Sequence, residues 1–157
     1  MDLPEGNYRK TVVGVTYQDS EFALIQKHHW HWWDFPQGGL EPYETLEQAV
    51  LREVIEEFST TQLGEPIDTG IRLKVPLTPE ALARYPDRGN VGKELFYLTV
   101  PYLGDKEELY HSFDVGEEEF VGFKWCGNLE LMTSVHYSLQ SPIVQVITFM
   151  ARQGLIV

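Results

Sequence analysis

Residues 38–57 constrain this chain more than any other segment. They begin with two glycines, which are expected to form a turn that lets the backbone approach a ligand or metal closely, and continue into a helical pattern that carries Glu53, Glu56 and Glu57. Intervals of three and four residues place these carboxylates within about 100° of one another around a helix. Such charges repel one another by roughly 0.2–0.5 kcal/mol per pair even on an exposed helix. A divalent cation bound between the carboxylates would replace this repulsion with attraction.

The same segment predicts which ion would bind and what would orient its ligands. Magnesium is a hard ion that prefers carboxylate oxygens and keeps waters and substrate phosphates in its shell. Arg52 can pair with Glu56 or reach back to Glu44, and either pairing would orient the carboxylates. The alternative is a solvated acidic helix face held by Glu–Arg pairs. The fixed offsets of the glycines, Glu44 and Arg52 favour the metal site.

These residues resemble the Nudix box, G-x5-E-x7-R-E-U-x-E-E-x-G-U, in which U is a bulky aliphatic residue. The matching positions are Gly38, Glu44, Arg52, Glu53, Val54, Glu56 and Glu57. Ser59 stands where the family has Gly, and Thr60 replaces the aliphatic residue. Because that Gly lets the helix end in a left-handed turn, Ser59 predicts a different helix exit, extended towards Gly64. No metal ligand is lost.

Outside the box the chain resembles the branch of bacterial RNA pyrophosphohydrolases and dinucleoside polyphosphate hydrolases. This likeness rests on residues 7–9, 33–39 and 119–125. It implies an α/β/α sandwich around a mixed sheet, formed by residues 1–157 as one domain. It also implies that Glu53, Glu56 and Glu57 hold magnesium, or manganese in its place. The backbone carbonyl of Gly38 or a neighbouring glycine would be a further ligand.

The patterns of strands and helices agree with this α+β expectation. Strands are predicted at residues 9–17, 22–27, 71–75, 94–100 and 120–125, and the first two form a hairpin. Helices are predicted at 45–58 and 143–152, with a helical turn at 79–84 inside a long loop. Ser141 is expected to cap the last helix and Gly154 to follow its end. Strands and helices mix without strict alternation, which favours a mixed sheet flanked by helices.

Further site residues follow from the branch resemblance. Glu119 matches a glutamate that reaches the metal cluster, although it also fits a solvated acidic loop, 117–119. Arg9 and Lys27 match basic positions of the branch, and Lys93 is a third candidate for binding substrate phosphates. For each, a plain surface cation is the alternative.

Aromatic side chains supply the remaining candidates. Tyr85, in the long loop with Arg84 and Arg88, can close over a nucleoside or phosphate. Trp30 or Trp32 can stack on a nucleobase, a contact worth about 1–3 kcal/mol, whereas Trp33 fits core packing. The neighbouring histidines, His28, His29 and His31, are not expected to bind metal, because no cysteine accompanies them.

Composition narrows the kinds of partner that the chain can bind. Asp and Glu total 24 against 12 Lys and Arg, a formal net charge of −12, which disfavours long phosphate backbones. Cys126 is the single cysteine, so an intrachain disulfide is excluded. The first residues lack the pattern of a signal peptide and no apolar run has the length of a membrane span. We therefore expect a cytoplasmic protein with no membrane association.

Together these features predict a magnesium-dependent hydrolase of phosphoanhydride bonds. Dinucleoside polyphosphates such as diadenosine tetraphosphate are the first expectation for its substrate. An RNA 5′-pyrophosphohydrolase and a pyrophosphatase for nucleoside triphosphates or nucleotide sugars are the alternatives within the family. A catalytically silent nucleotide- or protein-binding module is disfavoured, because such modules usually lose box glutamates and this chain retains them.

Overall fold

A computed structural model of the chain describes residues 2–28, 30–84, 89–112 and 120–157. Its strands are β1 (Tyr8–Gln18), β2 (Glu21–Lys27), β3 (Gln37–Gly39), β4 (Ile67–Pro76), β5 (Gly92–Pro101) and β6 (Phe120–Cys126). Its helices are α1 (Leu46–Phe58), α2 (Pro79–Arg84), α3 (Lys106–Ser112), α4 (Asn128–Ser134) and α5 (Gln140–Arg152), with a 3-10 helix, η1 (Tyr137–Leu139), before α5.

The hairpin of β1 and β2 starts the fold. Its turn residues, Asp19 and Ser20, have positive φ angles of 49° and 65°, as expected for a two-residue turn that matches the twist of its strands. On its other side β1 pairs in parallel with β5. The described strands form one mixed sheet in the order β4-β5-β1-β2-β6, and β3 pairs with β1 outside this path.

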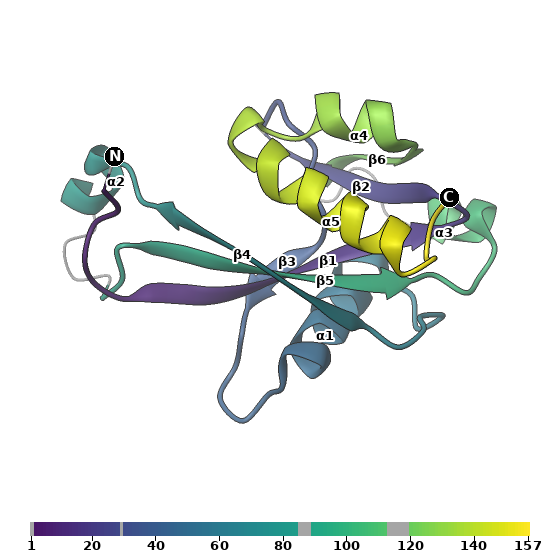
Figure 1. Ribbon diagram of the computed structural model, residues 1–157, viewed down its shortest axis with the longest axis horizontal. Helices are drawn as coiled ribbons and strands as arrows, with labels where there is room; N and C mark the ends of the chain where they lie inside the picture. The colour runs from purple at the N-terminus through teal and green to yellow at the C-terminus, as the bar shows by residue number, and fades with distance from the viewer. Residues whose placement is uncertain (1, 29, 85–88, 113–119) are drawn as a thin grey trace.

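Helices cover both faces of the sheet (Figure 1). Val50, Val54 and Phe58 of α1 are buried against one face with residues such as Val12 and Leu98. On the opposite face α5 buries its apolar side chains with other residues of β1, β2 and β5; the cluster includes Val13, Leu24, Tyr97, Ile143, Val146 and Met150. The expected mixed sheet between helices is therefore confirmed.

Some local expectations are wrong. The two glycines of the box belong to a short strand, β3, where they pair with β1 instead of forming a turn. Ser141 does not cap α5, because η1 precedes it and Leu139 occupies the N-cap position without a side-chain hydrogen bond. Strand β4 is longer than predicted, and α3 and α4 were not predicted. Gly154 follows α5 with a φ of 72°, as expected.

The exit of α1 also differs from expectation. Helix α1 ends at Phe58, and Ser59 adopts the left-handed conformation with φ 53° and ψ 41°. Its backbone N–H donates to the carbonyl of Ile55 at 2.9 Å. Ser59 thus makes the left-handed exit typical of Gly, and the predicted extension towards Gly64 is wrong. Phe58 is fully buried and Thr60 is 9% exposed, and the burial of both offsets the unfavourable backbone.

Within the residues described, no helix is long and apolar enough to span a membrane.

Candidate active site

Helix α1 presents the box glutamates at a fixed position. Thr45 caps its start: the Thr45 hydroxyl accepts from the backbone of Gln48, and the Gln48 side chain accepts from the backbone of Thr45. This reciprocal capping satisfies two backbone donors that a helix start leaves open. Gly14 of β1 lies so close to Val54 that a β-carbon there would overlap it. The helix therefore packs closely on β1 and cannot rotate freely.

Arg52 joins the helix to the segment before it. Its guanidinium donates to both carboxylate oxygens of Glu44, at 2.7 Å and 2.9 Å, and to the Gly39 carbonyl at 3.0 Å. It also contacts Glu53 at 2.6 Å, whereas Glu56 lies at 3.8 Å. Of the two pairings considered from the sequence, the one with Glu44 is the closer. The hydrogen bonds that Arg52 donates to Glu44 lower the pKa of Glu44 to about 2, and the same bonds raise the pKa of Arg52.

Two box carboxylates lie against the backbone of β3. Glu53 is 9% exposed, and its carboxylate fills the space where a β-carbon of residue 38 would be, so only Gly38 fits there. The carboxylate of Glu57 accepts a hydrogen bond from the backbone of Gln37 at 3.2 Å. Glu56 is more open, with 59% of its side chain exposed. The strand backbone and the helix carboxylates thus form one oxygen-rich junction.

This junction has the chemistry of a magnesium site. Its donors are carboxylate and carbonyl oxygens, which hard divalent cations prefer, and Gly38 leaves room for close approach of backbone and carboxylate. Among the described residues, no three acidic, histidine or cysteine side chains are already clustered as a metal site. The residue types and the close approach of the Glu53 carboxylate to the Gly38 backbone nevertheless fit the ion.

A cleft of about 620 Å³ opens where β2 ends and β5 begins. It is lined by Lys27, His28, Trp30, Asp34, Gln37, Val75, Thr78, Lys93, Leu95, His136, Ser138 and Leu139. Two of the three cations selected from the sequence, Lys27 and Lys93, thus line one cleft although they come from different strands. Gln37 belongs both to this lining and to the contact with Glu57.

Arg9, the third of these cations, lies beside the cleft lining. It is in register with Lys93 on the neighbouring strand β5. A β-carbon at Gly39 would overlap its guanidinium. Because successive residues of a strand face opposite sides, Gly38 meets Glu53 on one side of β3 and Gly39 meets Arg9 on the other. The box carboxylates and Arg9 are therefore separated only by a glycine strand.

Aromatic rings stand at one wall of the cleft. Trp30 and His136 are stacked, with ring centroids 5.9 Å apart and an interplanar angle of 18°, and Trp30 is 44% exposed. Trp32 contacts His136 edge-on at 5.4 Å. Trp33 instead packs beneath Lys124, whose ammonium lies 4.5 Å from its ring centroid, and this agrees with the packing role expected for it.

Asp34 and His136 are among the cleft residues that were not identified from the sequence. Asp34 lines the cleft, and burial raises the pKa of its carboxyl while Lys27, Lys93 and His136 oppose this shift. His136 lies far along the chain from Trp30, and no spacing pattern indicated their contact. In the sequence, Asp34 was noted only as part of residues 33–39, the segment that leads into the box. Nothing in that segment indicated a role for Asp34 in the cleft.

Several candidates fall outside the described residues. These are Glu119 with its neighbours Glu117 and Glu118, Tyr85 and Arg88, and His29.

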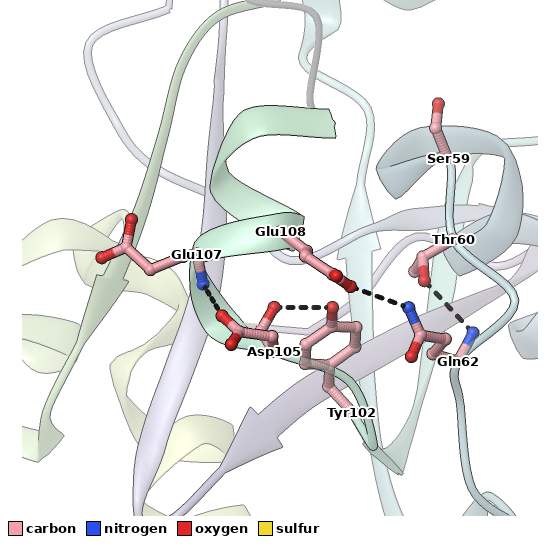
Figure 2. A pocket seen from close by; sticks show the side chains of 7 residues that line it. All are labelled: Ser59, Thr60, Gln62, Tyr102, Asp105, Glu107 and Glu108. Atoms are coloured by element: carbon pink, nitrogen blue, oxygen red, sulfur yellow. Dashed lines mark hydrogen bonds between the residues drawn. The ribbon is translucent and has the colours of Figure 1, made fainter.

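A second cavity, of about 550 Å³, lies beyond the end of α1 (Figure 2). Its lining residues are Ser59, Thr60, Gln62, Tyr102, Asp105, Glu107 and Glu108. Asp105, Glu107 and Glu108 give this lining a negative charge, and none of its described residues is Lys or Arg. An acidic lining repels phosphates, so the cleft with Lys27 and Lys93 is the better candidate for a nucleotide.

Comparisons with known proteins match most of the chain to one family. The profile of the NUDIX domain matches residues 7–145. The RNA pyrophosphohydrolases of Shigella boydii serotype 4 (strain Sb227) and Klebsiella pneumoniae (strain 342) are 28% and 24% identical to the chain. Each match covers 94% of this chain and 78% of the relative.

Solved structures share the fold. The E. coli dihydroneopterin triphosphate pyrophosphohydrolase matches with a TM-score of 0.66 and 21% identity, over 88% of this chain and 95% of that one. A C. elegans Ap4A hydrolase matches with a TM-score of 0.61 and 22% identity, over 92% and 99% of the two chains. At these identities the structures show the common architecture alone.

Proposed function

This chain belongs to the NUDIX family of pyrophosphohydrolases, and we propose that it cleaves small nucleoside polyphosphates, in the first place dinucleoside polyphosphates of the diadenosine tetraphosphate type. The observation that carries the proposal is that Gln37 belongs to both parts of the site. It lines the cleft of Lys27 and Lys93, and its backbone holds the Glu57 carboxylate. Phosphate-binding cations and metal-binding carboxylates thus meet at one residue.

We assign the metal site to Glu53, Glu56 and Glu57 with the backbone carbonyl of Gly38. A bound magnesium or manganese ion would offset the charge that develops on the phosphates and lower the pKa of the attacking water. Arg52 orients Glu53 through their contact at 2.6 Å. Glu44 in turn fixes Arg52. Glu119 stays our candidate for a further catalytic carboxylate.

The cations of the site bind the substrate phosphates. Lys27 and Lys93 approach from two strands, and Arg9 adds a guanidinium beside Gly39. Hydrogen bonds between such cations and phosphate oxygens are about twice as strong as neutral ones. The exposed face of Trp30 would stack on one nucleobase, a contact worth about 1–3 kcal/mol. Tyr85 stays a candidate for contact with the second nucleoside.

An RNA 5′ end is the second candidate substrate. It is supported by the relatives named RNA pyrophosphohydrolases, with 24% and 28% identity. Against it stands the formal net charge of −12, since a long phosphate backbone needs many cations. Lys27, Lys93 and Arg9 suffice for a short polyphosphate chain bound together with a divalent cation.

A substrate panel tests the proposal. Diadenosine and diguanosine tetraphosphates, nucleoside triphosphates, nucleotide sugars and 5′-triphosphorylated RNA would be incubated with protein and magnesium, and the released nucleotides separated. We expect a dinucleoside tetraphosphate to have a higher kcat/KM than the RNA from low to moderate salt. A higher kcat/KM for the RNA, falling with salt by about 0.7 per phosphate contact in a log–log plot, would overturn this substrate assignment.

A further inference from the structure

Of the described residues that line the cleft, Asp34 is the one carboxylate. Its backbone is held by two hydrogen bonds with Ile25 of β2, at 2.8 Å and 2.9 Å. Residues Phe35 and Pro36, which follow it, are buried. The position of Asp34 is therefore fixed by the sheet and does not depend on an exposed loop.

The surroundings of Asp34 join the cationic part of the cleft to its aromatic wall. Lys27, Lys93 and His136 are near enough to act on its charge, and the Trp30 side chain is near enough to lower the pKa of its carboxyl by hydrogen bonding. The indole N–H is the only donor of that side chain, so the edge of Trp30 points at the carboxylate. A ring stacked on the exposed face of Trp30 would have one of its own edges beside Asp34.

A carboxylate in a polyphosphate-binding cleft must contact something other than phosphate. An ionised Asp only accepts hydrogen bonds, and it repels phosphate oxygens. The groups of a nucleotide that donate are the N–H groups of its base and the ribose hydroxyls. Because the edge of Trp30 already points at Asp34, a base stacked on Trp30 would present the N–H groups of its own edge to Asp34.

We propose that Asp34 makes this end of the cleft a subsite for guanine. Guanine presents two neighbouring donors, N1–H and the exocyclic amine, which match two acceptor oxygens of one carboxylate. Adenine presents one donor beside an acceptor nitrogen and leaves an oxygen of Asp34 facing a lone pair. This inference rests on the proposed function and names the base that one end of the substrate carries.

The test uses the intact wild-type chain and changes the ligand first. Binding of guanosine, inosine and adenosine 5′-triphosphates would be measured by titration calorimetry, and their hydrolysis with magnesium measured separately. Inosine differs from guanosine only by lacking the exocyclic amine. Since a bidentate pair discriminates by about 1–3 kcal/mol, we expect guanosine to bind about ten-fold or more tightly than either competitor. Equal binding of the three nucleotides would overturn the inference.

The Asp34→Asn variant tests the residue itself. An amide offers one acceptor and one donor, which match adenine, so we expect the ratio of guanosine to adenosine kcat/KM to fall about ten-fold or more. Asp68→Asn is the matched control, because Asp68 pairs with Arg72 and does not line the cleft. If Asp34 only held the lysines in place, the variant would weaken all nucleotides equally, and the inference would be wrong.

The two proposals fail in different ways. A wild-type protein that prefers guanosine in binding but hydrolyses no nucleotide would retain the subsite and refute the proposed function. A protein that hydrolyses guanosine, inosine and adenosine nucleotides with equal kcat/KM would retain the function and refute the subsite.

Discussion

Arg52 donates hydrogen bonds to both carboxylate oxygens of Glu44, at 2.7 Å and 2.9 Å. The same guanidinium reaches the carbonyl of Gly39 and the carboxylate of Glu53. It therefore connects β3, the segment before α1 and a carboxylate that we assign to the metal site. This bidentate contact explains why an Arg and a Glu eight positions apart belong to one motif: each orients the other, and together they orient Glu53.

The Glu44 carboxyl should report this contact directly. Arg52 lowers its pKa from 4.5 to about 2. Because the folded-state pKa is lower, the stabilisation is present above about pH 4.5 and is lost as the pH falls towards 2. In Arg52→Gln the pKa of Glu44 should return towards 4.5, measured by NMR titration of the side-chain carboxyl. An unchanged low pKa in this variant would refute the role of Arg52.

Gly38 should not tolerate even a methyl group. In Gly38→Ala the added carbon would overlap the carboxylate of Glu53, so either β3 or Glu53 must move. We expect a loss of magnesium affinity and activity of about ten-fold or more, as for other displaced metal ligands. Gly127→Ala is the control, because a β-carbon there meets nothing within 4 Å. Equal activity of the two variants would show that close contact at Gly38 is unimportant.

Lys27 and Lys93 should act on substrate binding. Replacing either with Met removes a charge-assisted hydrogen bond worth about 1.5–3 kcal/mol, so kcat/KM for a dinucleoside tetraphosphate should fall about ten-fold or more. Lys106→Met is the control, since Lys106 pairs with Glu21 at 2.7 Å and lies outside the cleft lining. Steady-state kinetics check this, and a similar loss in all three variants would count against the assignment of the cleft.

Ser59 should carry a backbone cost that glycine relieves. A left-handed conformation costs an L-residue about 1–2 kcal/mol, and glycine avoids this at some cost in unfolded-state entropy. We expect Ser59→Gly to raise the free energy of unfolding by up to about 1 kcal/mol, measured by urea denaturation. Ser59→Ala, which keeps the β-carbon, should bring no such gain. A glycine variant no more stable than the alanine variant would contradict this.

The box could be predicted from the sequence because its contacts are short-range. The offsets of Glu44, Arg52 and Glu53 determine which side chains meet once α1 forms, and the amphipathic pattern of α1 determines which face it buries. Helix α4 was missed for a related reason: Gly127 occupies its N-cap position without a side-chain hydrogen bond, so no cap pattern marks its start.

The cleft could be predicted only in part, because it depends on the sheet. Lys27 was recognised by resemblance and Lys93 was singled out as a third candidate cation, but their convergence follows from strand order. The stack of Trp30 on His136 joins segments far apart in the chain, and periodicity carries no information on such contacts. At Ser59 the local rule that a left-handed helix exit favours Gly is correct, but the burial of Phe58 and Thr60 outweighs it.

The most direct test of the account is whether hydrolysis requires both a divalent cation and the box carboxylates. Hydrolysis of diadenosine tetraphosphate would be followed for wild-type, Glu57→Gln and Glu47→Gln proteins, in excess chelator and after addition of millimolar magnesium. Glu47 is the control because it is exposed in the first turn of α1. We expect wild-type and Glu47→Gln to be inactive in chelator and to recover with magnesium, and Glu57→Gln to stay lower by orders of magnitude. Full activity in excess chelator, or equal recovery of the two variants, would contradict the account.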